Sequence, residues 1–106
     1  MIKFLLVGSV LCVGFAGTAS AQDAAAGEKV FAKCKVCHVI DAPTNRVGPS
    51  LHGVIGRTAG AVDGFKYSES MVQHGKDGLV WSNETLETYL TDPKAFVPKN
   101  KMAFPA

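Results

Sequence analysis

No part of this sequence limits its possible structures as strongly as five residues, the run CKVCH at positions 34–38. Two thiols separated by two residues, followed at once by an imidazole, form the spacing with which a chain attaches haem c through two thioether bonds. On one helical turn, Cys34 and Cys37 can reach adjacent positions on the edge of the ring while His38 projects beneath its centre. The run therefore predicts a covalent haem c site, and such a site favours an electron carrier over an enzyme.

Other kinds of site use a similar pair of cysteines. A zinc site needs a second pair of ligands, but no further Cys-x-x-Cys pair or cluster of histidines follows. A thioredoxin-like redox pair lies beside a parallel sheet, but no strand pattern flanks residues 34–38. A structural disulfide across so short a loop would be strained. Together with His38, these considerations favour haem attachment.

The start of the chain reads as a secretory signal peptide. Lys3 gives a positive start, residues 4–17 are apolar, and the sequence ASA at residues 19–21 is a small-x-small cleavage site. The apolar stretch is too short, and too interrupted by glycine, for a membrane span. Cys12 lies within it and is expected to be removed with it. The sequence thus predicts a signal peptide at residues 1–21 and export to the periplasm.

Residues 22–106 are expected to form one small domain after cleavage. A chain of this size buries little apolar surface and is marginally stable without a staple or cofactor, and a covalently bound haem would serve as both. The whole sequence carries 11 Lys and Arg against nine Asp and Glu, a formal net charge of +2. This balance lacks the strongly basic character of nucleic-acid-binding domains, so no nucleic-acid partner is expected.

The sequence pattern predicts helices and loops without strands. Helices are expected at residues 24–35, 68–74 and 83–90, with one further helical turn at residues 93–96. Residues 39–66 are rich in Pro, Gly and Asn, which is typical of a long loop that wraps around something. No alternation of polar and apolar residues indicates a strand. The expected fold class is therefore all-α.

Further motifs accompany the CKVCH run in collinear order along the chain. They are Gly27–Phe31 before the run and, after it, Gly48–Arg57, Phe65–Tyr67, Trp81, Leu86, Tyr89-Leu90, Asp92–Lys94 and Pro98–Met102. With these motifs, residues 27–104 resemble class I cytochrome c, the mitochondrial-like branch that has periplasmic bacterial relatives. The resemblance implies the small all-α cytochrome c fold, in which short helices and long loops surround one covalently bound haem.

The resemblance also assigns roles to individual residues. Cys34 and Cys37 would form the thioether bonds, and His38 would be the proximal iron ligand. Met102 would be the distal ligand, and a methionine thioether favours ferrous iron and so raises the reduction potential. The other methionine of the mature chain, Met71, lies on an expected helix and is interpreted as a packing residue.

Further residues would support these ligands. In the family, the carbonyl at the position of Pro49 accepts the proximal imidazole N–H, which orients the ring. The match to Arg57, Tyr67 and Trp81 implies donors to a buried haem propionate, a charged group that needs such partners. Tyr89 would lie beside the methionine sulfur. The walls of the haem site would include Leu51, Leu86 and Leu90.

The chain ends at Ala106, whereas the family continues into a C-terminal helix that packs near the positions of Gly27 and Phe31. The resemblance therefore implies a cytochrome c domain at residues 22–106 that is C-terminally truncated, with Val30 and Phe31 exposed unless something else covers them. Three explanations stay open. They are a shortened gene product, which we favour, a dimer or partner that covers the exposed helix face, and a self-sufficient short form.

The resemblance implies a soluble periplasmic single-electron carrier with a His/Met-ligated haem c, without enzymatic activity or a small-molecule substrate. Its partners would be redox proteins such as a membrane cytochrome complex and a terminal oxidase or other acceptor, and only these would bring it to a membrane. Two alternatives stay open: a haem protein with a loosened sixth ligand that acts as a peroxidase or small-ligand sensor, and a non-functional remnant. Lysines that would steer an acidic partner, or else simply form a solvated face, are Lys29, Lys33, Lys35, Lys94, Lys99 and Lys101.

Overall fold

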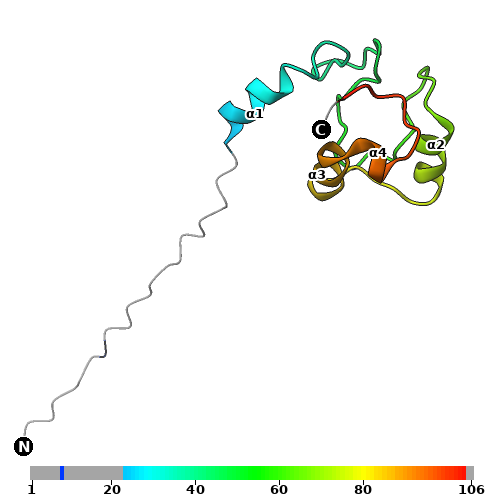
Figure 1. Cartoon of the computed structure of the whole chain (residues 1–106). Coiled ribbons are helices and arrows are strands. Elements are labelled where there is room, and N and C mark those ends of the chain that lie inside the picture. Colours follow the sequence, from blue (N-terminus) through cyan, green and yellow to red (C-terminus); the bar gives the residue numbers. More distant parts are fainter. Residues whose placement is uncertain (1–7, 9–22, 105–106) are drawn as a thin grey trace, which may run out of the picture.

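The computed structural model describes residue 8 and residues 23–104, and within them it contains four helices. In chain order these are α1 (Ala24–Phe31), α2 (Glu69–Lys76), α3 (Asn83–Thr91) and α4 (Pro93–Phe96) (Figure 1). The only β pairing among the described residues is an isolated antiparallel bridge between Thr58 and Val80. The prediction of an all-α fold is confirmed.

The predicted signal peptide at residues 1–21 lies outside the described residues, apart from Gly8, and so do residues 105 and 106. The signal peptide and its boundary with the domain therefore stay predictions. None of the helices in the described part of the chain is both long and apolar enough to span a bilayer.

The local sequence determines where each helix begins. A Ser or Asp side chain precedes every helix described here and accepts a bond from the backbone N–H three residues later, which pairs a donor that the first helical turn leaves free. At α3 the exchange is reciprocal: the N–H of Ser82 donates to the Thr85 hydroxyl over 2.8 Å, and the N–H of Thr85 donates to the Ser82 hydroxyl over 3.1 Å. The four caps are Asp23, Ser68, Ser82 and Asp92.

The predictions for α2, α3 and α4 are confirmed to within two residues at each end, but the first helix ends at Phe31 instead of residue 35. Just after Phe31, two backbone hydrogen bonds span three residues: the N–H of Lys33 donates to the Val30 carbonyl over 3.2 Å, and that of Cys34 to the Phe31 carbonyl over 2.8 Å. Bonds of this span wind the chain more tightly than an α-helix does. The tighter winding leads directly into the turn that holds the CKVCH run.

Helix α1 stands apart from the other three helices (Figure 1), and none of its residues is buried. Val30 is 59% exposed, as the sequence predicts. The same prediction for Phe31 is wrong, because its side chain lines the cavity described in the next section and is half-buried there.

The small core lies where α2 and α3 meet the long loop between α1 and α2 and the segment after α4. The prediction of a loop at residues 39–66 is confirmed, since this stretch contains neither helix nor strand. Two aromatic rings pack at the centre of the core with their centroids 5.1 Å apart, a favourable separation for a tilted pair. The buried hydrophobic residues of the described chain are Ala59, Met71, Trp81, Tyr89 and Val97, and the ring pair is Trp81 with Tyr89.

Gly75 on α2 lies directly against the backbone of Ala59 in the long loop. A methyl group at Gly75 would collide with the Ala59 carbonyl oxygen and would lie 2.9 Å from the Ala59 carbonyl carbon. A methyl group at Gly27 in α1 would meet nothing within 4 Å. The lack of a side chain at Gly75 therefore allows the loop to approach α2 closely, at a cost in helix propensity.

We expect Gly75→Ala to lower the free energy of unfolding by about 1–3 kcal/mol, because the loop backbone must move to accommodate the methyl group. Gly27→Ala is the matched control: it should preserve stability or raise it by up to about 1 kcal/mol, since alanine favours helix more than glycine does. Urea unfolding followed by circular dichroism measures both. Equal stability of the two variants would contradict the packing described for Gly75.

Candidate cofactor site

The long loop, α2, α3 and the segment after α4 line a cavity of about 430 Å³. This volume falls in the range of about 300–1,000 Å³ that is typical of small-molecule and cofactor sites. Most of the lining side chains are aliphatic or aromatic, with few polar groups among them. The fold thus gathers every site residue predicted from the sequence around one cavity, namely Cys34, Cys37, His38, Pro49, Arg57, Tyr67, Trp81, Tyr89 and Met102.

Cys34 and Cys37 lie half-buried in the turn that follows α1, and both are free thiols. The Cys34 carbonyl accepts hydrogen bonds from the N–H of Cys37 over 3.1 Å and from the N–H of His38 over 2.9 Å. These bonds hold the two thiols and the imidazole within one turn. Burial raises the pKa of the Cys34 thiol, so it stays neutral near pH 7.

The imidazole of His38 is oriented by the loop residues that follow it. Its Nδ1 lies 2.7 Å from the Pro49 carbonyl oxygen. Because a carbonyl only accepts, Nδ1 carries a proton, and in the neutral imidazole this leaves on Nε2 the lone pair that can bind a metal. Gly48 packs against the ring, where a methyl group would lie 2.7 Å from both ring nitrogens. The imidazole is therefore held by a hydrogen bond and by steric contact.

Tyr89 of α3 contacts both the core and Met102, which lies on the segment after α4. Its hydroxyl donates to the sulfur of Met102 over 3.9 Å, and its ring also packs near Phe96, with centroids 6.3 Å apart. Burial raises the pKa of Tyr89 to about 12. The phenol therefore remains a hydrogen-bond donor at all physiological pH values, and the Met102 sulfur receives that bond.

The three predicted donors, Arg57, Tyr67 and Trp81, also line the cavity. Arg57 donates to the Ser50 carbonyl over 2.8 Å, and Trp81 is 6% exposed. The hydroxyl of Tyr67 accepts the Val62 N–H over 3.0 Å, which leaves its own proton free to be donated. Burial raises the pKa of Tyr67, while the bond from Val62 and the positive charge of Arg57 oppose that increase. These groups can therefore supply positive charge and donors to an anionic substituent of a ligand.

The remaining predictions concern the walls and the second methionine. Leu51, Leu86 and Leu90 all line the cavity, although Leu90 is also 42% exposed at the surface. Met71 lines the cavity and is buried in the core, so it packs as the sequence predicts while remaining a second sulfur near the site. Sequence reasoning missed Asn100, which is buried and lines the cavity. An asparagine in a loop carries no local signal that it is buried.

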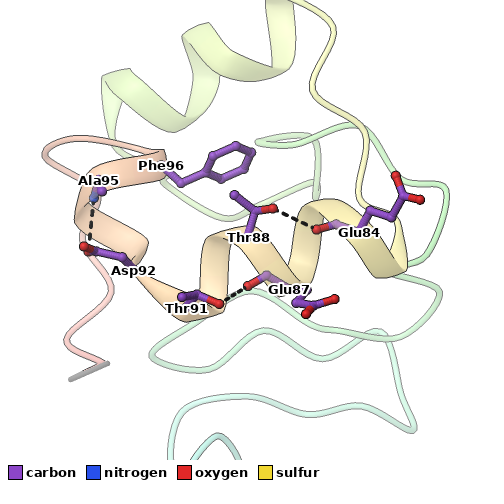
Figure 2. A pocket seen from close by; sticks show the side chains of 7 residues that line it. All are labelled: Glu84, Glu87, Thr88, Thr91, Asp92, Ala95 and Phe96. Carbon is purple, nitrogen blue, oxygen red and sulfur yellow. Dashed lines mark hydrogen bonds between the residues drawn. The ribbon is translucent and has the colours of Figure 1, made fainter. Parts of the chain in front are cut away.

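A second hollow lies on the surface between α3 and α4 (Figure 2). Its threonine hydroxyls donate to carbonyls of their own helix, Thr88 to Glu84 over 3.1 Å and Thr91 to Glu87 over 2.7 Å. Asp92 accepts the Ala95 N–H as the cap of α4. These polar groups are thus paired within the helices, and nothing in the hollow indicates a ligand. The described residues also contain no group of three or more His, Cys, Asp or Glu side chains that could hold a metal ion.

Comparison with known proteins relates this arrangement to a group of haem proteins. No protein-family model matches the chain. Cytochrome c2 of Rhodobacter capsulatus is 45% identical over 100 residues, which are 88% of this chain and 73% of the relative. Cytochrome c2 of Rhodopseudomonas palustris is 53% identical over 83 residues, 78% of this chain but 58% of the relative. The solved structure of cytochrome c2 from Rhodospirillum centenum matches with a TM-score of 0.73 at 42% identity, covering 80% of this chain and 85% of that one.

We expect the burial of Tyr89 to make stability fall as the pH rises from about 10 to about 12. The unfolded phenol ionises near pH 10, whereas the folded one holds its proton up to a pKa of about 12, so the unfolded state binds fewer protons in this window. Tyr89→Phe should therefore lose less stability than the natural protein between about pH 9 and about pH 11. Urea unfolding at both pH values measures the difference, and parallel losses would contradict it.

Proposed function

Because the chain belongs to the class I cytochrome c family, with the cytochromes c2 among its relatives, we propose that it is a periplasmic single-electron carrier whose haem c iron is ligated by His38 and Met102. One observation carries this proposal. The two thiols of the CKVCH run, the imidazole of His38 and the thioether of Met102 all line one largely apolar cavity. A porphyrin needs such apolar walls together with a small number of well-placed polar groups.

The residues at the cavity fit a haem in chemistry as well as in position. Cys34 and Cys37 would hold it through thioether bonds, and the protonated Nδ1 of His38 leaves Nε2 as the ligating nitrogen. Arg57 and Tyr67 would pair with a propionate, whose charge is costly to bury without donors. When bound, the haem supplies an iron that exchanges one electron between its ferrous and ferric states.

The protein adjusts that iron through the groups around its two ligands. The Pro49 carbonyl accepts the His38 N–H, and such a bond raises the basicity of the imidazole and fixes its orientation. The thioether of Met102 favours the ferrous state and raises the reduction potential. Its sulfur also accepts the Tyr89 hydroxyl. Two protein ligands would fill both axial positions, so the site is suited to electron transfer and not to binding a substrate.

We infer the cellular location from the predicted signal peptide and the partners from lysines at the cavity. The predicted signal peptide would direct the protein to the periplasm. Lys33 and Lys101 line the cavity and would place positive charge near the haem edge. We infer that they attract an acidic surface on redox partners such as a membrane cytochrome complex and a terminal oxidase or other acceptor, which speeds association at low salt.

We expect Cys34→Ala with Cys37→Ala to abolish covalent haem and to leave an unfolded or degraded chain. A domain this small depends on the cofactor for much of its buried surface. Haem staining of the periplasmic fraction after denaturing electrophoresis tests attachment and location together. A folded, stable double variant, or a natural protein that does not stain, would contradict the proposal.

Met102→Ala should keep covalent haem but lose the low-spin state of a methionine-ligated iron, with a lower reduction potential and higher peroxidase activity. Met71→Ala is the matched control, because Met71 also lines the cavity. It should retain the spectrum and the potential while losing about 2–5 kcal/mol of stability through the cavity left in the core. The weak far-red absorption band of the ferric protein measures ligation. If that band vanishes in Met71→Ala and persists in Met102→Ala, the assigned ligand is wrong.

A further inference from the structure

The side chain of Asn100 is 5% exposed and lies between α4 and Met102. Its Nδ2 donates to the carbonyl oxygens of Pro93 and Val97, each over 2.9 Å. Its Oδ1 accepts the backbone N–H of Met102 over 2.9 Å and the Lys94 ammonium over 3.2 Å. A carboxamide offers two donor hydrogens and two acceptor lone pairs, so this one is fully hydrogen-bonded.

The partners fix the orientation of the amide. Backbone carbonyls only accept, while the N–H of Met102 and the ammonium of Lys94 only donate. Exchanging the oxygen and nitrogen of Asn100 would therefore break every one of these bonds. No other side chain of similar shape can replace them, because aspartate has no donors for the two carbonyls and leucine has neither donors nor acceptors.

The carbonyls that hold Asn100 belong to a firmly packed part of the fold. Val97 is fully buried in the core, Pro93 is buried at the start of α4, and α4 packs against α3. The Lys94 ammonium also bonds to the backbone carbonyl of Asn100. The amide therefore connects an anchored helix end to the backbone of Met102.

The segment that carries Met102 has little else to hold its backbone. Among the hydrogen bonds between described residues, the one from the Met102 N–H to Asn100 is the only one that reaches the backbone of residues 101–104. Lys99, just before Asn100, has a φ of 58°. A non-glycine residue in this left-handed region costs free energy and persists only where the surrounding contacts impose it.

We propose that Asn100 is a positioning residue for Met102: its amide clamps the methionine segment to α4 and so keeps the sulfur at the iron. This inference rests on the proposed function, in which Met102 is a ligand. With the clamp weakened, the methionine segment opens more often, and a small external ligand that competes for the iron binds more tightly in proportion to the open fraction.

The test measures imidazole binding to the ferric holoprotein by visible spectroscopy. Asn100→Asp keeps the shape and the acceptors but removes both donors, and it should raise the affinity for imidazole about tenfold or more, as expected for the loss of buried hydrogen bonds. Lys94→Met should raise it about two- to threefold, since the exposed lysine supplies only a weaker part of the clamp. Amide hydrogen exchange of the Met102 N–H, followed by NMR, should accelerate in the same order.

Gly75→Ala serves as the control for a general loss of stability, because Gly75 contacts Ala59 and Thr58 and not the Met102 segment itself, and it should leave imidazole affinity unchanged. An equal rise in Gly75→Ala and Asn100→Asp, or an affinity in Asn100→Asp within about twofold of the natural protein, overturns the proposal. If Asn100→Asp does not fold, an unchanged affinity and unchanged exchange in Lys94→Met overturn it. A natural ferric protein that lacks the far-red band would refute Met102 ligation instead, and exchange of the Met102 N–H would still decide whether Asn100 acts as a clamp.

Discussion

Many apolar side chains of this small domain line one cavity. Few hydrophobic side chains of the described chain are buried, and three of these, Met71, Trp81 and Tyr89, also line the cavity. A chain of this length exposes a large fraction of its surface. Much of the apolar surface that it can bury is therefore buried against the group that fills the cavity. The proposed haem is then part of the core. The long loop, the helices and the proposed ligands would all pack against this haem. The loop can therefore be held in place by contact with the haem, without secondary structure of its own.

The two sides of the proposed metal site are restrained by different means. His38 lies within the turn that holds both thiols, and Pro49 and Gly48 fix its ring through loop contacts close in sequence. Met102 lies on a segment whose described backbone has a single hydrogen bond, to Asn100. Covalent attachment would therefore secure the proximal side, whereas the distal side depends on a few hydrogen bonds of modest free energy. Opening of the site, where it occurs, should begin at Met102.

Sequence reasoning succeeded where the cause is local. The helix starts were predictable because a capping oxygen and its N–H partner lie three residues apart, and the cavity residues were predictable because they follow the motifs of a known family. It failed where distant contacts decide the outcome. Phe31 is half-buried because it lines the cavity together with residues distant in sequence. The first helix ends early because the chain winds more tightly as it enters the CKVCH run. The role of Asn100 depends on where the carbonyls of Pro93 and Val97 lie, which no local pattern records.

An electron carrier must change the charge of its iron while the ligands stay in place. Here the groups next to each proposed iron ligand are neutral or already paired: the Pro49 carbonyl beside His38, the Tyr89 phenol beside Met102. Because burial holds the pKa of Tyr89 at about 12, that phenol does not gain or lose a proton near neutral pH when the iron changes state. In the proposed site, the hydrogen bond to the Met102 sulfur would then persist in both oxidation states. A site with an exchangeable sixth ligand would need a Met102 segment that opens readily. The amide clamp at Asn100 opposes such opening.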